Sequence, residues 1–302
     1  MDLFKIYPPR PDWVHKGNYG SVLVVCGSKL YSGSATLAGV SALRAGCDLV
    51  TVVSPQRAAD VASHTLPDLI TYPLRGDYLS GRHLNQILDV AHVRRINSVV
   101  LGCGLDRHPA TLLVIQKLIS KFMVPMVLDA DGLRAIAQKP EVVFGKQVIL
   151  TPHAGELAVL LGQDGRIGEF QGDPSTSPSA TSSGPSGSGQ SFEVKLVAAK
   201  QAASKYHAVV LLKGYVDIIT DGQTTITNNS GTPFMTKGGF GDTLSGILGA
   251  LLSRGTGLFE AAHIAAYING KAGELAAQKF GEGVVASDIF DQIPQVLRTR
   301  DN

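Results

Sequence analysis

The feature that most constrains the fold of this chain is a repeated alternation of short apolar runs with stretches of helical spacing. Residues 22–26 (Val-Leu-Val-Val-Cys) form a β-branched run between Gly20 and Gly27, as expected of a strand buried on both faces. Residues 34–46 then place apolar side chains near helical intervals, and residues 48–53 return to strand character. Two strands joined through a helix in this way form a βαβ unit, in which the strands run parallel.

The same alternation continues along most of the chain. Further strands are expected at residues 98–101, 125–128, 147–150 and 208–212, and helices at residues 109–122, 242–254 and 259–280. Residues 217–220 and 224–227, separated by Asp-Gly-Gln, indicate a β-hairpin added late to the sheet. The sequence therefore predicts an α/β fold with a mainly parallel central sheet and helices on both faces.

One segment breaks this pattern. Of the 21 residues from 171 to 191, 17 are Ser, Gly, Pro or Thr, a composition that buries too little apolar area to offset its ordering entropy. Strand and helix patterns resume at Val194. We therefore interpret residues 171–191 as a flexible insertion within one domain that spans residues 1–302, and not as a linker between two domains.

Composition and charge exclude several classes of protein. Apolar residues make up 44% of the chain and charged residues only 17%, which fits a compact globular protein and not a disordered chain. The 27 Lys and Arg residues nearly balance 25 Asp and Glu residues, so no broad basic field favours nucleic acid or a membrane as a partner. The N-terminus lacks a basic region followed by an apolar one, which predicts a cytoplasmic protein.

The cysteines and most histidines give no sign of a metal site. Cys26, Cys47 and Cys103 are far apart in apolar surroundings, so buried free thiols are expected. Four histidines lack ligand spacing and are expected at the surface: His15, His64, His83 and His92.

A glycine-rich turn before the helix at residues 242–254 is the strongest sign of chemistry. Residues 236–246 read Thr-Lys-Gly-Gly-Phe-Gly-Asp-Thr-Leu-Ser-Gly. Glycines let the backbone approach an anion, and a helix N-terminus adds partial positive charge, so a phosphoryl group would be stabilised there. Asp242 is then placed to act as a base, although an Asp at this position can also simply cap the helix. Neither a Walker A motif nor a dinucleotide-binding G-x-G-x-x-G occurs in the required context.

Seven short blocks in order make the pattern specific. They lie at residues 16–20, 31–34, 102–105, 128–133, 150–156, 212–215 and 239–242. In order and spacing, the chain resembles the ADP- or ATP-dependent NAD(P)H-hydrate dehydratases of the ribokinase-like superfamily, from about Lys16 to Ile289. The resemblance implies a ribokinase-like three-layer α/β/α fold. It also implies repair of NADH or NADPH that has been hydrated at the nicotinamide ring.

The resemblance implies a mechanism and a set of site residues. The ring hydroxyl of the (S)-hydrate would be phosphorylated by ADP or ATP, and phosphate would then be eliminated. Asp242 matches the base that activates the hydroxyl, and the N–H groups of Gly239, Phe240 and Gly241 match an anion hole. Positions that contact the hydrated cofactor match Ser34, Gly104, His153 and Asp242. Positions that contact the adenine nucleotide match Lys213, Gly214, Tyr215, Val216, Asp217 and Gly241.

The sequence departs from the family at two of these positions. Ser34 stands where the family usually has Ala, and Phe240 stands where it usually has Ser or Thr. A hydroxyl is gained at Ser34 and one is lost at Phe240, while the backbone N–H donors of the glycine turn are retained. Substrate detail is therefore more open than the type of reaction.

Three acidic residues are candidates for holding Mg²⁺. Asp129 and Asp131 end a strand at the carboxyl edge of the sheet, where either metal coordination or helix capping is open to them. Glu156 follows His153 by one helical turn, and either orients a metal-bound water or caps the helix. His153 itself can act as a cap at a strand end or as a substrate contact.

Two other functions remain open from the sequence. A ribokinase-like kinase for a hydroxymethylpyrimidine, a thiazole alcohol or a sugar would use the same base and anion hole, and a protein that only binds nucleotide would keep the pocket. The blocks at residues 16–20 and 31–34 favour the dehydratase, and Asp242 argues against binding alone. The resemblance also suggests a homotetramer and a separate epimerase partner. The choices of ADP or ATP, NADH or NADPH, and monovalent cation stay open.

Overall fold

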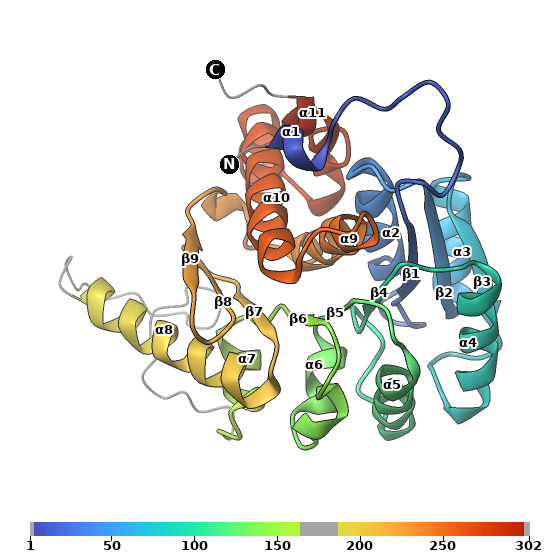
Figure 1. The fold of residues 1–302 in the computed structure, drawn as a ribbon, viewed down its shortest axis with the longest axis horizontal. Helices are drawn as coiled ribbons and strands as arrows, with labels where there is room; N and C mark the ends of the chain where they lie inside the picture. The colour runs from blue at the N-terminus through green and yellow to red at the C-terminus, as the bar shows by residue number, and fades with distance from the viewer. Residues whose placement is uncertain (1–2, 164–186, 299–302) are drawn as a thin grey trace.

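A computed structural model describes residues 3–163 and 187–298 of the chain. Its centre is a nine-stranded sheet of order β3-β2-β1-β4-β5-β6-β7-β8-β9 (Figure 1). Neighbouring strands from β3 to β7 pair in parallel, whereas β8 and β9 each pair antiparallel with the strand before them. The strands are β1 (Ser21–Val25), β2 (Leu49–Pro55), β3 (Ile70–Leu74), β4 (Ser98–Leu101), β5 (Met126–Leu128), β6 (Val148–Leu150), β7 (Val209–Leu212), β8 (Asp217–Thr220) and β9 (Thr225–Asn228).

Helices cover both faces of this sheet. One layer contains α2 (Ser34–Arg44), α3 (Gln56–Thr65), α9 (Phe240–Ser253), α10 (Leu258–Phe280) and α11 (Ile293–Arg298), with the short α1 (Leu3–Ile6) beside it. The other layer contains α4 (Leu84–Val93), α5 (Pro109–Lys121), α6 (Asp131–Ile136), α7 (Ala154–Leu160) and α8 (Gly187–Tyr206). The predicted three-layer fold with a mainly parallel sheet and a late hairpin is confirmed.

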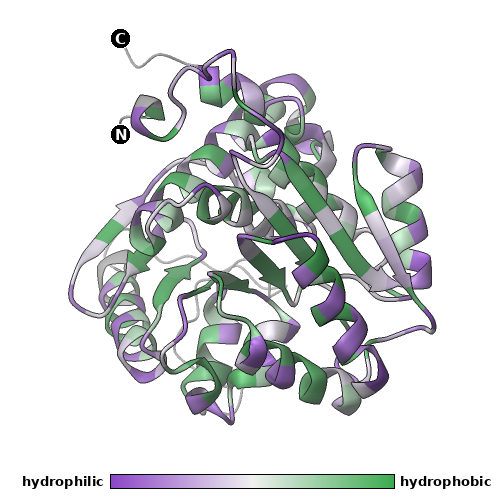
Figure 2. Cartoon of the chain, turned by 45° about the vertical axis from the view of Figure 1, so that its right-hand side comes forward, coloured by the Kyte–Doolittle hydropathy of each residue, from purple (hydrophilic) through white to green (hydrophobic). Residues whose placement is uncertain are grey.

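The alternation of side chains along each strand divides the interior into two cores. In β1, Val22 and Val24 pack under α2 and α9, while Leu23 and Val25 face the layer of α4 and α5. All four side chains are fully buried, as the continuous apolar run predicts. Figure 2 shows the strands as mainly hydrophobic and the helices as hydrophobic toward the sheet and hydrophilic away from it.

Helix α9 approaches its neighbours closely because glycines lie at its contacts. A Cβ atom on Gly246 would overlap the carbonyl oxygen of Ala38 in α2, and one on Gly249 would lie 2.5 Å from Cγ2 of Val100 in β4. Side chains at these two positions would push the helix away from α2 and the sheet. The glycines therefore fix the position of α9 above β1 and β4.

The strand order reverses between β1 and β4. The chain leaves β1 toward α2 and β2 on one side, and leaves β4 toward α5 and β5 on the other. The loops that follow the two strands stay in contact, since the backbone N–H of Gly27 donates to the Cys103 carbonyl at 2.7 Å. Ligands of open α/β sheets bind at such a point, outside the carboxyl ends of the strands.

Two elements differ from the expectations, one strand and the start of one helix. Strand β3 has no counterpart among the predicted strands; Pro73 and half-exposed side chains hide an edge strand from pattern analysis. Of the predicted insertion, residues 171–186 lie outside the described residues, while residues 187–191 are not loop but the start of α8. Tertiary packing of the later turns stabilises a helix that begins in weak helix formers, although each Gly there costs about 1 kcal/mol relative to Ala.

The expectation that His83 lies at the surface is wrong. Its side chain is 2% exposed, and its Nδ1 accepts a hydrogen bond from the Ser80 backbone at 3.1 Å. This contact belongs to a capping box at the short 3₁₀ helix Gly81–His83, which turns the ring inward. His15, His64 and His92 are exposed as expected, and all three cysteines are buried and free.

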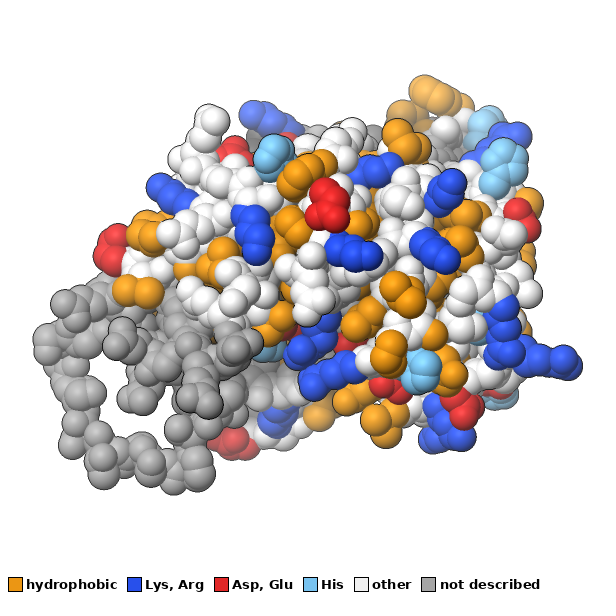
Figure 3. All heavy atoms as spheres, turned by 90° about the horizontal axis from the view of Figure 1, so that it is seen from below, with side chains coloured by type: hydrophobic (Ala, Val, Ile, Leu, Met, Phe, Trp, Pro, Cys, Tyr) orange, Lys and Arg blue, Asp and Glu red, His pale blue; other side chains and the backbone are white. Residues whose placement is uncertain are grey.

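The outer surface carries mixed charges. Figure 3, which views the layer of α4 to α8, shows Lys and Arg side chains distributed among uncharged ones. Within residues 3–163 and 187–298, no helix combines the length and apolar character that crossing a bilayer requires.

Candidate active site

Asp242 lies in the first turn of α9, above the point where the strand order reverses. The N-cap position is Gly239 and receives no side-chain cap, so Asp242 does not serve as the helix cap. Its carboxylate instead lies among Ser34, Cys103 and Asp129. Ligand atoms of Cys103, Asp129 and Asp242 all fall within 4.8 Å of one another. The helix therefore directs its acidic residue toward the carboxyl ends of β1, β4 and β5.

The glycines of the turn are required by its shape. Gly239 has φ of +103°, and a Cβ atom there would lie 2.7 Å from Leu37 and 2.9 Å from Ala286. A Cβ atom on Gly241 would lie 3.3 Å from the Nζ of Lys213. Because the first N–H groups of a helix have no partner within the helix, this turn presents free donors beside a lysine. That arrangement suits a phosphoryl group that gains negative charge.

A buried ion pair adjoins Asp242. Lys213, directly after β7, donates from Nζ to Oδ1 of Asp129 at 2.9 Å, and their side chains are 23% and 4% exposed. Oδ2 of Asp129 accepts from Ser245 at 3.3 Å and from Cys103 at 3.7 Å. Lys213 also lies 3.9 Å from Glu156. These contacts satisfy the buried carboxylate of Asp129 from several sides.

The surroundings raise the pKa of Asp242 to about 7. Burial is the main cause, and the Asp129 carboxylate adds to it, while the Ser34 hydroxyl and Lys213 act in the opposite direction. Burial alone would lower the pKa of Lys213, but the carboxylates of Asp129 and Glu156 raise it more strongly, so the ammonium stays charged. Asp242 therefore changes protonation near neutral pH beside a permanent cation, which is a condition suited to a general base.

The backbone beside Asp129 is strained. Ala130 has φ of 47° and ψ of −110°, a conformation that residues with a Cβ atom rarely adopt. Gly102 approaches this point so closely that a Cβ atom on it would overlap the Asp129 carbonyl oxygen. Strain of this kind is found mostly at functional sites, because the surrounding structure must hold it in place.

The four predicted contacts for the hydrated cofactor do not all meet at one point. Ser34 begins α2 and Gly104 follows β4; a Cβ atom on Gly104 would lie 2.5 Å from the Ser34 Oγ. His153 lies two strands away, after β6, with an exposed ring. Ser34 and Gly104 therefore lie together beside Asp242, and His153 lies further along the same edge.

His153 and Glu156 cap α7. The Nδ1 of His153 accepts from the N–H of Gly155 at 3.0 Å, and the Glu156 carboxylate accepts from the N–H of His153 at 3.0 Å. His153 and Glu156 therefore both act as caps of α7. The exposed edge of the His153 ring stays available for other contacts. Water activation by Glu156 stays a prediction.

Of the predicted nucleotide contacts, residues 213–217 lie at the turn between β7 and β8, and Gly241 lies in the first turn of α9. The N–H of Gly214 donates to Asp217 at 3.1 Å, and the Asn228 amide donates to the same carboxylate at 2.9 Å. Burial raises the pKa of Asp217 to about 6. Val216 is half-buried, whereas Tyr215 is 93% exposed. The turn is adjacent to the glycine turn, since Lys213 contacts both.

The three candidate Mg²⁺ ligands do not form one cluster. Asp129 and Glu156 both approach Lys213, but Asp131 receives a hydrogen bond from the Asp106 backbone and faces Arg134 and Arg107. Burial raises the pKa of Asp131. Mg²⁺ bound through nucleotide phosphates needs only one or two carboxylates from the protein, so Asp129 is sufficient for such an ion without Asp131.

Sequence analysis missed three residues of this region. Cys103 was expected only as a buried thiol, although it lies inside a Gly-Cys-Gly block of the motif. Ser245 follows Asp242 by one helical turn, a spacing that places it toward Asp129. Asn269 of α10 accepts from Thr243 at 2.8 Å and donates to the Phe240 carbonyl at 3.4 Å, and no local signal in the sequence indicates this.

A three-layer fold with a glycine turn and an Asp above the reversal of strand order defines a ribokinase-like protein. Comparison with known families is more specific: the model described as NAD(P)H-hydrate dehydratase matches residues 22–295. The chain belongs to this family. The expected resemblance is therefore confirmed.

Individual relatives agree with this assignment. The ADP-dependent (S)-NAD(P)H-hydrate dehydratase of Nitrosopumilus maritimus is 35% identical over 299 residues, covering 98% of this chain and 95% of that protein. The bifunctional NAD(P)H-hydrate repair enzyme Nnr of Methanothermobacter thermautotrophicus is 36% identical over 299 residues, covering 98% of this chain but 53% of that protein. The chain thus spans about half the length of the bifunctional relatives that it matches.

A solved structure supports the fold. The ADP/ATP-dependent NAD(P)H-hydrate dehydratase from Bacillus subtilis, co-crystallized with ATP/Mg²⁺, superimposes with a TM-score of 0.75 at 22% identity, covering 98% of this chain and 96% of that one.

Proposed function

We propose that this protein dehydrates the (S)-epimer of hydrated NADH or NADPH at the expense of an adenine nucleotide. The observation that carries the proposal is Asp242: a carboxylate with a pKa of about 7 adjoins an uncapped glycine turn and the buried cation of Lys213. A hydroxyl acceptor needs a base of this kind, and a transferred phosphoryl group needs these donors. Family membership and the names of the full-length relatives support the same reaction.

The reaction follows from these groups in two steps. Asp242 accepts the proton of the ring hydroxyl as its oxygen forms a bond to the terminal phosphorus of ADP or ATP, and the bond to the leaving AMP or ADP breaks. The N–H groups of Gly239, Phe240 and Gly241 stabilise the charge that develops on the phosphoryl oxygens. The ring then loses the phosphate together with a proton from the neighbouring carbon, which restores the dihydronicotinamide.

The donor nucleotide is proposed to lie along the β7–β8 turn. Lys213 contacts Asp129 there and adjoins Gly241, so its ammonium lies where the phosphates would pass the glycine turn. Gly214, Tyr215, Val216 and Asp217 supply the rest of this surface. Bound Mg²⁺ would neutralise phosphate charge, with Asp129 as the candidate protein ligand, while the carboxylate of Asp242 stays available for the hydroxyl proton. The relative named ADP-dependent supports ADP, and the B. subtilis enzyme was crystallized with ATP/Mg²⁺.

The substrate is proposed to contact Ser34 and Gly104 on the other side of Asp242. Ser34 shares a hydrogen bond with the Asp242 carboxylate, and Gly104 lies against Ser34. His153, which follows β6 and forms a backbone bridge with Lys213, presents an exposed ring on the opposite side of Asp242 from Ser34 and completes the proposed set. Replacing His153 by Ala should therefore weaken apparent binding of the hydrate more than that of the nucleotide.

The test measures both products of the reaction. Purified protein, hydrated NADPH, Mg²⁺ and either ADP or ATP should restore absorbance at the dihydronicotinamide band, with one inorganic phosphate formed for each ring restored. A protein that leaves both hydrates unchanged with either nucleotide, yet phosphorylates a thiazole or pyrimidine alcohol, would be a kinase instead. Binding of nucleotide without any turnover would support the third possibility, a non-catalytic protein.

Other expectations stay predictions. They are a single domain over residues 1–302, a homotetramer, a separate epimerase that interconverts the hydrate epimers, and a cytoplasmic location.

A further inference from the structure

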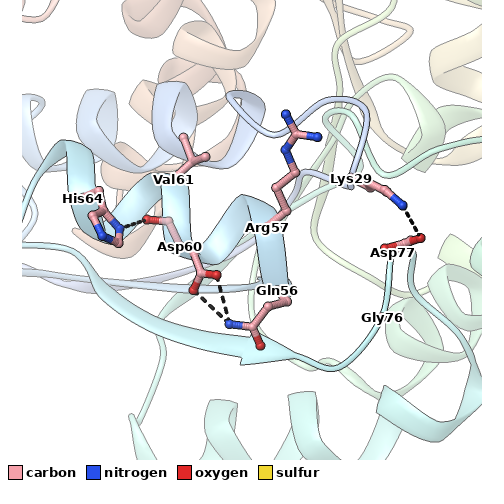
Figure 4. A pocket seen from close by; sticks show the side chains of 8 residues that line it. All are labelled: Lys29, Gln56, Arg57, Asp60, Val61, His64, Gly76 and Asp77. Atoms are coloured by element: carbon pink, nitrogen blue, oxygen red, sulfur yellow. Dashed lines mark hydrogen bonds and ion pairs between the residues drawn. The ribbon is translucent and has the colours of Figure 1, made fainter.

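A second hollow lies on the same edge of the sheet as Asp242, beyond β2 and β3. Its volume is about 470 Å³, within the range of small-molecule sites. Figure 4 shows it between α3 and the loops that follow β1 and β3, which carry Lys29 and Asp77. The residues that line it come soon after the carboxyl ends of three parallel strands, so the hollow opens in the same direction as the proposed active site.

One short segment joins the hollow to the proposed substrate site. A Cβ atom on Gly104 would lie 2.5 Å from Oγ of Ser34 and 2.7 Å from Cβ of Tyr31, so Tyr31 adjoins both residues. Lys29 stands two residues before Tyr31, and its backbone N–H donates to the Asp77 carbonyl at 2.9 Å. A ligand that passes Ser34 and Gly104 therefore reaches the hollow across Tyr31, whose side chain is 52% exposed.

The hollow lies on the acceptor side of the site. Strand order places β2 and β3 on one side of the β1–β4 pair, and β7 and β8 on the other. The proposed nucleotide surface follows β7, so the donor and the hollow are on opposite sides of Asp242. In the proposed reaction the acceptor is a dinucleotide, and its adenosine half must extend away from the ring that reacts.

The charges in the hollow leave one cation available. Lys29 pairs with Asp77 at 2.9 Å, and the amide of Gln56 donates to both carboxylate oxygens of Asp60 at 2.9 and 3.0 Å. Arg57 is exposed and has no ion pair or hydrogen bond to any other residue in the described part of the chain. Its guanidinium is therefore free to bind an anion.

An unpaired arginine, beside one acid that is paired with Lys29 and one that is bonded to the Gln56 amide, favours a phosphate over a hydroxyl. Guanidinium groups bind phosphate through two parallel hydrogen bonds. In dinucleotide sites, an acidic residue recognises the ribose 2′-hydroxyl of NAD, and an arginine accommodates the 2′-phosphate of NADP. We propose that this hollow binds the adenosine 2′-phosphate end of the hydrated dinucleotide through Arg57, so that hydrated NADPH is preferred over hydrated NADH. This inference rests on the proposed function.

The test separates binding from turnover. NADPH and NADH carry the same adenosine ends as their hydrates and serve as the binding probes. Calorimetry should show that NADPH binds the wild-type protein about 10-fold more tightly than NADH does. Arg57→Ala should remove most of that preference by weakening NADPH binding while NADH binding stays the same. Arg57→Lys, which keeps the charge but loses the planar fork, should retain part of it. Adenosine 2′,5′-bisphosphate should bind the wild-type protein more tightly than Arg57→Ala.

The matched control is Lys117→Ala, which removes one exposed cation from α5 in the opposite helical layer and should leave the preference unchanged. Equal binding of NADPH and NADH by the wild-type protein, or an unchanged preference in Arg57→Ala, would overturn the inference. Turnover of the two hydrates is read separately. If binding prefers NADPH through Arg57 but neither hydrate is turned over, the subsite is supported and the proposed function is rejected. If the hydrates are turned over but the preference for NADPH does not depend on Arg57, the proposed function is supported and the subsite is rejected.

Discussion

The proposed active site and the hollow beside α3 hold ion pairs of equal length in different surroundings. Lys213 and Asp129 are 2.9 Å apart with side chains 23% and 4% exposed, and Lys29 and Asp77 are also 2.9 Å apart but 60% and 61% exposed. Burial raises the pKa of Asp242 beside the first pair, with Asp129 adding to the rise and Lys213 opposing it, whereas water screens the second pair. The comparison teaches that burial, and not contact distance, decides which charges of this edge control chemistry.

The difference comes from what covers each region. Helix α9 lies close above β1 and β4 and removes water from Asp129 and Asp242. The hollow lies beside α3 at the β3 edge of the sheet, and the charged side chains of Lys29 and Asp77 in it stay exposed. The buried cluster around Asp242 can therefore shift the pKa of a base. The exposed side chains of the hollow can bind a charged group that remains partly hydrated.

The largest effect is expected from Asp242→Asn. Removing a general base lowers turnover by about 10²- to 10⁴-fold, while the amide keeps the shape of the side chain, so nucleotide binding should stay close to that of the wild-type protein. Recovery of the dihydronicotinamide absorbance measures turnover, and calorimetry with ADP measures nucleotide binding. The matched control is Glu260→Gln, which changes an exposed acid in the first turn of α10. More than a tenth of wild-type activity in Asp242→Asn would remove the base role.

The next effect is on stability. Lys213→Met leaves the buried carboxylate of Asp129 without its cation, and breaking a buried pair costs about 3 kcal/mol of unfolding free energy. Urea denaturation at pH 8 measures this loss. The double variant Lys213→Met with Asp129→Asn removes both charges and should regain most of the stability. A single variant as stable as the wild-type protein would show that the pair is not effectively buried.

A smaller effect is expected from pH. Because Asp242 is the base and its pKa is about 7, kcat/KM should fall about fivefold from pH 7 to pH 6 and level off above pH 8. Folding raises the pKa of Asp242 above its ordinary value of 3.8, so the ionised carboxylate destabilises the folded state. This loss of unfolding free energy develops as pH rises from about 4 to 7. Asp242→Asn should therefore raise Tm at pH 8 and leave it unchanged at pH 4. An activity profile centred near pH 4 would contradict the assignment.

The smallest effect is expected from the exposed pair. Lys29→Met breaks a contact as short as that of Lys213, yet exposed pairs contribute only about 0–1 kcal/mol. Urea denaturation beside Lys213→Met measures the contrast directly. High salt, which screens exposed charges, should shrink the difference in stability between Lys29→Met and the wild-type protein. A loss of stability equal to that of Lys213→Met would show that contact length matters more than burial at this edge.

Much of the fold could be predicted because its strands are buried on both faces. Continuous apolar runs identify β1, β4 and β7, and the Asp-Gly-Gln turn identifies the β8–β9 hairpin. The pattern fails at β3, whose side chains alternate only weakly and which contains Pro73. It also fails at His83, because a local capping box and not periodicity decides where that ring lies.

The site could be predicted in its parts but not in its contacts. The glycine turn and Asp242 carry a local signal, since the spacing of glycines before a helix has a physical meaning. The pair of Asp129 and Lys213 joins residues 84 positions apart, and Asn269 reaches the turn from another helix. Contacts of this kind depend on the tertiary arrangement, which no single window of sequence contains.

The close fit of α9 against α2 and β4 also bears on how the protein is made. The chain emerges from the ribosome with its N-terminal strands first, and α9 follows only after residue 239. Until then the apolar surface of β1 and β4 that faces α9 has no cover, and Gly246 and Gly249 have not yet formed their contacts. The nascent chain therefore carries an exposed core for most of its synthesis, a state in which chaperones protect a protein from aggregation.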